Sequence, residues 1–196
     1  MSESEVAGSD IYLQPTVVFQ RGRKYMVCAK SGHGKTSLLN FIYGSNRSFD
    51  GTIDYGMPVD SPFALRRDKL SYLFQDLCLF SELTAIENVR LKNNLTHFKS
   101  DAEMEAMLAA ILPAEKKDQP VRTLSLGQRQ RVAAVRALCQ PFDYLLLDEP
   151  FSHIDHQNAQ LLADLVCREV DNQGAGLIVT ALDAIDLFNF DEVLHL

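Results

Sequence analysis

The chain has no long apolar run, no paired cysteines and no excess of basic residues, and each absence excludes a class of protein. No stretch approaches the roughly 18 apolar residues that cross a bilayer, so a membrane role must come through a partner. The scattered Cys28, Cys78, Cys139 and Cys167 form no CxxC pair, which argues against a zinc site or a disulfide framework. The net charge of -7 argues against a general nucleic-acid binder, which would present a basic face.

The composition fits one globular domain. The chain has 196 residues, of which 46% are hydrophobic, so it is long enough and apolar enough to bury a core. Residues 1–10 are polar and acidic, which predicts a flexible tail without the apolar stretch of a signal peptide. We find no internal repeat or low-complexity tract, and we therefore expect a single domain over residues 1–196.

The order of strand, glycine-rich loop and helix near the start indicates an α/β fold with a mostly parallel sheet. Residues KYMVCA lead into the loop, and TSLLNFIYG continues as a helix that Gly44 can close. Short β-prone segments with turn residues between them predict an antiparallel β region at the N-terminus. These segments are 11–13, 16–19 and 24–28, and further strands are expected at 48–56 and 69–74.

Residues 80–123 predict a small helical insert. Thr84-x-x-Glu87 and Ser100-x-x-Glu103 are capping-box patterns, each of which opens a helix, and the second helix should span 101–111. The α/β pattern then returns. We expect helices at 128–139, 156–169 and 183–189 and strands at 143–148, 176–180 and 192–196.

Residues 29–36, AKSGHGKT, match the phosphate-loop pattern G-x-x-x-x-G-K-[ST] except at Ala29. Backbone N–H groups at a helix N-terminus favour anions, Lys35 would contact the β- and γ-phosphates, and Thr36 would bind Mg²⁺. Alanine in place of the first glycine is tolerated if its φ stays negative. The alternative is a strand–turn–helix with an incidental lysine. The expected nucleotide-binding residues are Ser31, Gly32, His33, Gly34, Lys35, Thr36 and Ser37.

The apolar segment YLLLDEP, residues 144–150, ends in two acids. It should carry Asp148 to the carboxyl edge of the sheet, where α/β ligands bind. There Asp148 would hold Mg²⁺ and Glu149 would polarise an attacking water. The alternative is an ordinary strand end with two solvated acids.

Residues 124–131, LSLGQRQR, complete an ordered set of three motifs. Ser125-x-x-Gln128 is a capping box, and a capped helix N-terminus is also an anion site. Together, in this order, the three motifs resemble the ATP-binding cassette (ABC) family. The resemblance covers residues 11–196 and implies a P-loop NTPase core that binds ATP and Mg²⁺.

The resemblance implies a head-to-tail homodimer in which the LSLGQ segment of one subunit completes the ATP site of the other. It places Ser125, Gly127 and Gln128 against the nucleotide of the partner, and Asp155 at the dimer seam, although Asp155 would also cap the next helix. Leu126 stands where the family usually has glycine, so we expect altered packing there and close backbone approach at Gly127.

The resemblance assigns three further positions. Gln75, with Glu149, would be catalytic, since a glutamine there contacts Mg²⁺ and the attacking water in the family. Tyr12 is the best candidate for stacking on adenine, and Phe19 is the second. Ala181 stands where the family has a histidine that contacts the γ-phosphate, which predicts firm ATP binding with slow or partner-dependent hydrolysis.

The other histidines offer no clear replacement. His153 and His156 are the nearest candidates in sequence, but they lie after the acidic strand rather than after the last core strand. Ordinary surface or core roles are expected for His97 and His195.

Two functions therefore stay open. The first is the ATPase subunit of an ABC transporter, cytoplasmic and peripheral on the inner face of the membrane through an integral-membrane permease. The segment from Gln75 to residue 131 is similar to subunits of lipoprotein-releasing, macrolide-efflux or cell-division permeases. The second is an ATP-gated dimerising switch with little hydrolysis, supported by Ala181 and Leu126. DNA-repair and translation cassettes carry long coiled-coil or zinc insertions, which this acidic chain lacks, and no nucleic-acid partner is expected.

Overall fold

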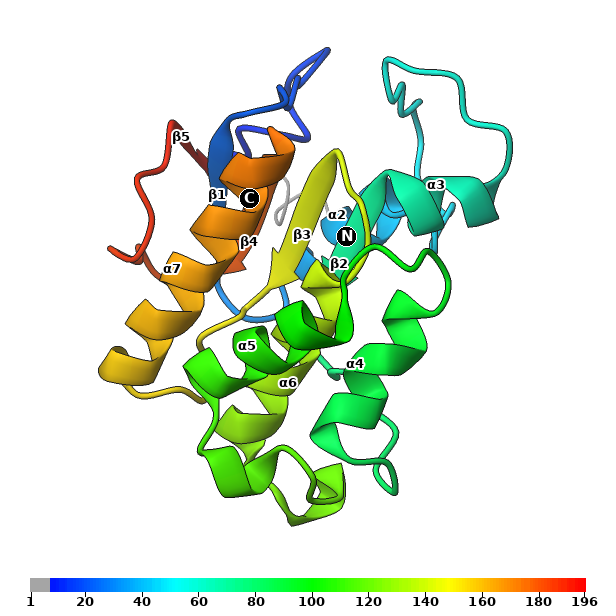
Figure 1. Ribbon diagram of the computed structural model, residues 1–196. Helices are drawn as coiled ribbons and strands as arrows, with labels where there is room; N and C mark the ends of the chain where they lie inside the picture. Colours follow the sequence, from blue (N-terminus) through cyan, green and yellow to red (C-terminus); the bar gives the residue numbers. More distant parts are fainter. Residues whose placement is uncertain (1–7) are drawn as a thin grey trace.

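The computed structural model describes residues 8–196, and a five-stranded parallel sheet forms its centre (Figure 1). The sheet order is β2-β3-β4-β1-β5, and every strand pairing in it is parallel. Four of its strands are apolar and buried, as expected for a sheet that is covered on both faces. The strands are β1 (Lys24–Cys28), β2 (Leu70–Leu73), β3 (Tyr144–Asp148), β4 (Gly176–Ala181) and β5 (Glu192–His195). The expected α/β class and parallel core are confirmed.

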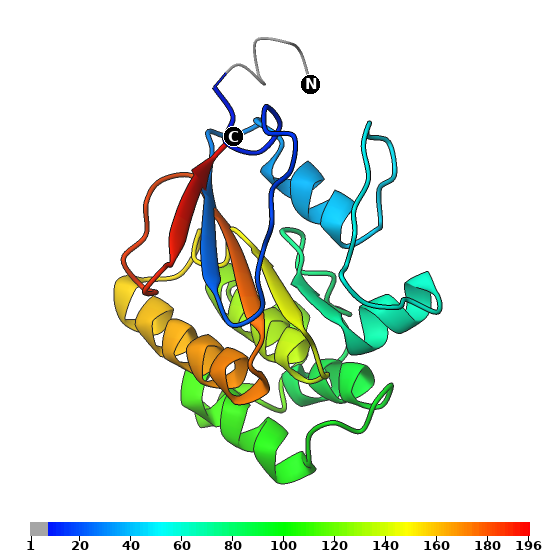
Figure 2. The ribbon, with the colours of Figure 1, turned by 90° about the horizontal axis from the view of Figure 1, so that it is seen from above.

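Helices cover both faces of this sheet (Figure 2). On one face lie α2 (Lys35–Ile42) and α3 (Pro62–Asp68). On the other lie α6 (Leu126–Leu138) and α7 (His156–Gln173), and α4 (Ala85–Asn93) and α5 (Asp101–Ile111) pack against α6. Successive residues of one strand point to opposite faces. Leu145 and Leu147 accordingly join the cluster of α6 and α7, whereas Leu146 joins that of α2.

The stretch between β2 and α6 is helical. Both predicted capping boxes are confirmed: the Thr84 hydroxyl accepts from the Glu87 N–H and the Ser100 hydroxyl accepts from the Glu103 N–H, and each glutamate reaches back to the cap. Two short 3₁₀ helices, η1 (Ala114–Lys116) and η2 (Val121–Thr123), lead on to α6. No helix in residues 8–196 has the length and apolar character needed to span a membrane.

The predicted antiparallel β region is wrong for the described residues. Residues 11–13 form a turn, because the Ser9 hydroxyl accepts hydrogen bonds from the N–H groups of Ile11 and Tyr12. Residues 16–19 belong to no strand, and Pro15 just before them has no N–H to donate to a ladder. β1 itself pairs in parallel with β4 and β5.

Two other predicted elements are also wrong. Residues 48–56 bend instead of forming a strand, since Gly51 and Gly56 have positive φ and the Asp54 carboxylate accepts from the Gly56 N–H at 2.8 Å. Residues 183–189 form bends, with Phe188 turned into the core, rather than a helix. Conversely, the sequence reading missed α3, which Ser61 caps and Pro62 begins.

Part of the predicted tail is held in place. Asp10 donates its N–H to the His195 carbonyl and accepts from the His195 N–H, both at 2.8 Å, at the end of β5. Ser9 is buried. Residues 1–7 of that prediction lie outside the described residues.

Candidate ATP site

The site lies at the carboxyl edge of the sheet. Because all strands run in parallel, the residues that follow β1, β2, β3 and β4 meet at one edge, where ligands of α/β proteins bind. The phosphate loop follows β1, Gln75 follows β2, Glu149 follows β3 and Ala181 ends β4. The parallel topology thus brings together segments that are far apart in the sequence, from the phosphate loop at residues 29–36 to Ala181.

The loop between β1 and α2 has an open helix N-terminus. Gly34, the N-cap of α2, has φ 86° and provides no side-chain cap, and Gly32 has φ 80°. The first N–H groups of α2 are therefore free of a capping side chain, as an anion site requires. Ala29 is not among the residues with positive φ, so its methyl group causes no left-handed strain.

The Lys35 ammonium group lies inside this loop. It donates to the carbonyls of Ala29 (2.6 Å) and Lys30 (3.1 Å), and it lies 3.2 Å from the Glu149 carboxylate. Lys35 is only 4% exposed, and Glu149 balances its buried charge. The structure thus brings together the residue expected to bind phosphate and the residue expected to activate water.

A second pair joins the first helix to the segment after β2. The Thr36 hydroxyl donates to Gln75 Oε1 at 3.2 Å. Together with Asp148, these two side chains offer hydroxyl, amide and carboxylate oxygens, the donor types that Mg²⁺ prefers. Residues 8–196 contain no cluster of three or more histidine, cysteine, aspartate or glutamate ligands, and a site with one carboxylate suits Mg²⁺ bound with nucleotide phosphates.

Asp148 is 1% exposed and is held by two hydroxyl groups. Thr180, its register partner on β4, donates to Oδ1 at 2.7 Å, and Tyr72 on β2 donates to Oδ2 at 3.3 Å. Burial first, and then the neighbouring Asp148 carboxylate, raise the pKa of Tyr72 above its ordinary value, so Tyr72 remains a donor. The Asp148 carboxyl group is thereby fixed in orientation.

Glu149 has an unusual backbone. Its φ of 48° lies in the left-handed region, which costs a residue with a Cβ free energy. Its N–H donates to Thr180 Oγ1 at 3.1 Å, and its carbonyl accepts from Gln130 Nε2 at 2.9 Å. Bonds from β4 and α6 therefore support this conformation from both sides.

The LSLGQ segment forms the predicted capped N-terminus. The Ser125 hydroxyl accepts from the Gln128 N–H (3.2 Å), and the Ser125 N–H donates to the Gln128 side chain (3.0 Å). Ser125 and Leu126 are exposed, so this helix end is accessible to a partner. A Cβ added at Gly127 would overlap the His153 carbonyl oxygen, so Gly127 closely approaches the chain's own segment after β3, and its approach to a partner's nucleotide stays a prediction.

Asp155 caps α7, which confirms one of its two expected roles. Its carboxylate accepts from the Asn158 N–H at 3.1 Å and from the Asn158 amide group at 2.6 Å. These hydrogen bonds lower the pKa of Asp155 below its ordinary value. Its place at a dimer seam stays a prediction.

Position 181 is apolar in its surroundings as well as in its side chain. Ala181 is buried with Met26 and Cys28 in a small cluster, and no histidine follows it before β5. His153 Nδ1 lies 2.8 Å from the Ser152 hydroxyl, and His156 begins α7. Neither is shown to replace the missing histidine.

The two candidate adenine-stacking rings pack inward. Tyr12 is partly buried against the cluster of α2, and its hydroxyl is buried without a hydrogen-bond partner. Phe19 packs edge to face on Tyr25, with ring centroids 5.0 Å apart. This packing does not favour either ring as an exposed platform, and a contact with adenine stays a prediction for both.

Thr180, Tyr72 and Gln130 are site residues that the sequence reading missed. Only Thr180 could have been predicted from the sequence, because parallel pairing of the two predicted strands sets it beside Asp148. The roles of Gln130 and Tyr72 arise from contacts between elements that are distant in the sequence, and no local sequence pattern predicts such contacts.

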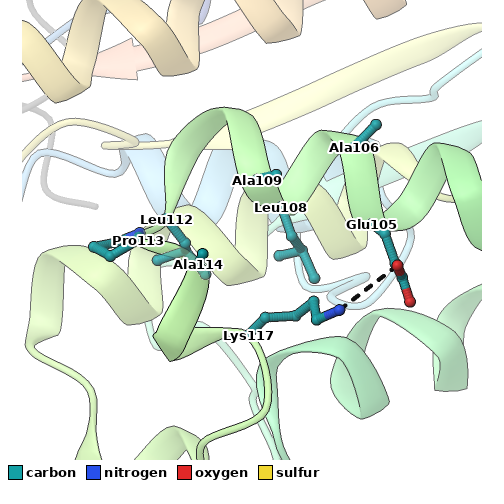
Figure 3. Close-up of a pocket in the computed structure, with 8 residues that line it drawn as sticks. All are labelled: Glu105, Ala106, Leu108, Ala109, Leu112, Pro113, Ala114 and Lys117. Carbon is teal, nitrogen blue, oxygen red and sulfur yellow. Dashed lines mark ion pairs between the residues drawn. The ribbon is translucent and has the colours of Figure 1, made fainter.

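A hollow of about 310 Å³ lies elsewhere, in the helical stretch (Figure 3). Its lining is mostly apolar, from Leu108 and Leu112 to Pro113, and Glu105 and Lys117 form an ion pair at 3.6 Å on its rim. None of the predicted site residues lines it.

Comparison with known proteins identifies related chains. Residues 14–152 match the family model described as ABC transporter. The cytochrome c biogenesis ATP-binding export protein of Vibrio parahaemolyticus is 33% identical over 167 residues, 83% of this chain and 80% of that protein. The lipoprotein-releasing system ATP-binding protein of Buchnera aphidicola is 29% identical over 174 residues, 84% of this chain and 76% of that protein.

Solved structures agree with these relatives. The dimeric structure of a bacterial ABC transporter cassette has a TM-score of 0.73 and 26% identity, covering 85% of this chain and 78% of that chain. A dimeric post-hydrolysis state of the same cassette, bound to ADP and Pi, has a TM-score of 0.71. From the phosphate loop and the acidic strand end that meet at one edge of the sheet, the capped LSLGQ helix and these likenesses, the chain belongs to the ABC transporter family, as an ATP-binding subunit.

Proposed function

We propose that this subunit hydrolyses ATP at the seam of a head-to-tail homodimer and drives a membrane permease. The observation that carries the proposal is the pairing of Lys35 with Glu149, 3.2 Å apart, at the open N-terminus of α2. Phosphate oxygens that enter the loop would compete for the Lys35 ammonium group. Glu149 would then be free beside the γ-phosphate.

The chemistry needs few groups. Glu149 accepts a proton from a water that attacks the γ-phosphorus, and the bond to the bridging oxygen breaks so that this oxygen leaves with ADP. Bound Mg²⁺, held by Thr36, Gln75 and Asp148, would neutralise phosphate charge. Lys35 stabilises the same charge from the loop.

Exposure at the two halves of the site supports the dimer. Ser31 and Gly32 of the loop are exposed, and so are Ser125 and Leu126 at the N-terminus of α6. A head-to-tail pair would cover both, placing the α6 N-terminus of one copy against the γ-phosphate bound by the other. The solved relatives that resemble this chain are dimers.

The helical stretch offers a surface for the permease. Phe80 is 60% exposed, and Leu91, Leu95 and Phe98 around the end of α4 are 43%, 51% and 36% exposed. Exposed apolar side chains are typical of an interaction surface when they are contiguous. We place the permease here, beside Gln75, with the subunit on the cytoplasmic face of the membrane.

The segment that follows Gln75 is hydrogen-bonded to α6. Arg136 on α6 donates to the carbonyls of Leu77 and Cys78, both at 2.6 Å, just after Gln75. Movement of the docked segment would therefore pull on α6. Among permeases we propose the lipoprotein-releasing, macrolide-efflux and cell-division group, a proposal that the Buchnera relative supports.

The buried Ala181 favours a second candidate, an ATP-gated switch. In that case ATP would still join two copies, but phosphate release would be negligible. Both candidate functions require an ATP-dependent dimer, and they differ in the rate of ATP hydrolysis.

The dimer is tested by light scattering after size-exclusion chromatography. Glu149→Gln with Mg·ATP should elute as a dimer, and the same protein with ADP as a monomer. Ser125→Arg and Lys35→Ala, each added to Glu149→Gln, should abolish the ATP-dependent dimer. A dimer that is indifferent to nucleotide, or that survives both additions, would contradict the proposed site.

A further inference from the structure

Gln130 connects the helix of the LSLGQ segment to the backbone of Glu149. It lies on α6, is 3% exposed, and donates from Nε2 to the Glu149 carbonyl at 2.9 Å. The same Nε2 lies 3.4 Å from the Ser152 hydroxyl, which itself donates to the Glu149 carbonyl at 3.2 Å. One turn earlier, Gly127 packs against the His153 carbonyl. The start of α6 and residues 149–153 therefore form one packed unit.

The bond meets Glu149 where its backbone is strained. With φ 48°, this residue sits in a region that disfavours side chains with a Cβ, and such a conformation persists only where neighbours impose it. Thr180 holds the N–H of Glu149, and Gln130 holds its carbonyl. From this backbone conformation the Glu149 carboxylate reaches to 3.2 Å from the Lys35 ammonium group.

The amide oxygen of Gln130 makes no stabilising contact. Its Oε1 is buried without a hydrogen-bond partner, which disfavours the folded state. Methionine or leucine of similar size would avoid that penalty. A glutamine at this position donates a hydrogen bond from Nε2 to the Glu149 carbonyl, and an apolar residue could not.

We propose that Gln130 is a positioning residue for Glu149. It fixes the left-handed turn that aims the carboxylate, without touching the nucleotide. Because it projects from the helix whose N-terminus would face the partner's nucleotide, it also ties Glu149 to that helix. The inference rests on the proposed function in its use of Glu149 as the base.

Two variants and one matched control test the proposal in the full-length chain. Gln130→Met keeps the size and removes the donor, and Gln130→Glu keeps the shape but replaces the donor by an acceptor. Gln140 is the control, since it is also buried, donates from Nε2 to the Arg66 and Leu70 carbonyls, and has an unpaired Oε1. Gln140→Met should perturb packing similarly, away from Glu149.

Two readouts separate this inference from the proposed function. In steady-state phosphate release, both Gln130 variants should lose at least tenfold in kcat with KM within twofold, and Gln140→Met should stay within twofold in both. In hydrogen exchange without nucleotide, the amides of Glu149 and Ser152 should exchange at least fivefold faster in the Gln130 variants only.

The outcomes are distinct. Unchanged exchange at Glu149 and Ser152 in both Gln130 variants would overturn the inference, as would an equal loss of kcat in Gln140→Met. If the wild type releases no phosphate, hydrolysis fails as a function, and the exchange measurement alone decides whether Gln130 holds Glu149.

Discussion

The Lys35 ammonium group lies 3.2 Å from the Glu149 carboxylate, so the cation that we propose binds phosphate is neutralised by the chain itself. A phosphate must displace this carboxylate. Glu149→Gln should therefore bind ADP more tightly than the wild type, by about 3- to 10-fold, which corresponds to roughly 0.7–1.4 kcal/mol. ADP isolates the effect because it needs no hydrolysis. Isothermal titration calorimetry measures it, and equal or weaker ADP binding would show that the pair does not compete.

Thr180 links the two acids through one buried hydroxyl. It donates to Asp148 and accepts from the Glu149 N–H. Thr180→Val keeps the shape and removes the partner of the Glu149 N–H and of Asp148 Oδ1, while Tyr72 still donates to Asp148 Oδ2, so the free energy of unfolding should fall by about 1–3 kcal/mol. Thr123→Val, which removes an exposed hydroxyl bonded to the Pro120 carbonyl, is the control and should change little. Urea denaturation compares the two, and equal losses would argue against a special role for Thr180.

Gly127 has no room for a side chain. Gly127→Ala would press its methyl group against the backbone carbonyl of His153, so either α6 or the segment after β3 must shift. We expect a loss of about 1–3 kcal/mol in the free energy of unfolding, the usual cost of overpacking. Leu126→Ala, at an exposed neighbour, should cost far less. Thermal unfolding compares the two variants. A Gly127→Ala protein as stable as wild type would contradict the close contact between Gly127 and the His153 carbonyl.

Acid should loosen α4 and α5 through their caps. Glu87 and Glu103 have pKa values below the ordinary value of 4.5, mainly because their carboxylates accept hydrogen bonds from the backbone N–H groups of Thr84 and Ser100. A lowered pKa stabilises the fold above the ordinary value, and this stabilisation is lost as pH falls below about 4.5. Glu87→Gln with Glu103→Gln should therefore lower Tm at pH 7, and the difference from wild type should shrink toward pH 3.

Glu115→Gln controls for the loss of a surface charge outside a capping box. Its Tm difference from wild type should not follow the same pH dependence. A double-variant difference that is constant from pH 7 to pH 3 would contradict the capping account.

Local patterns predicted the three capped helices α4, α5 and α6 well, but not α3. The capping boxes at Thr84, Ser100 and Ser125 placed the starts of α4 and α5 and the N-terminus of α6 because each involves residues only three apart. The N-terminal β region failed for the opposite reason. Strand pairing is decided between distant segments, and here β4 and β5 take both edges of β1.

The same distinction separates the site residues. The phosphate loop and the acids after β3 lie in contiguous motifs and were predicted. Gln130 meets the Glu149 carbonyl across 19 positions, and Thr180 meets its N–H across 31, through packing of α6 and the register of β4. Motifs identify the groups expected to touch ligand, whereas the groups that orient them depend on the assembled sheet.

Steady-state phosphate release with Mg·ATP tests the central claim most directly, measured on the wild type beside Lys35→Ala and Glu149→Gln. The account predicts turnover in the wild type and a loss of about a hundredfold or more in Glu149→Gln, the range of general-base catalysis. Lys35→Ala should lose turnover together with nucleotide binding. A wild type that binds ATP but releases no phosphate, or a Glu149→Gln protein that keeps its rate, would contradict the claim that Glu149 drives hydrolysis without a histidine at position 181.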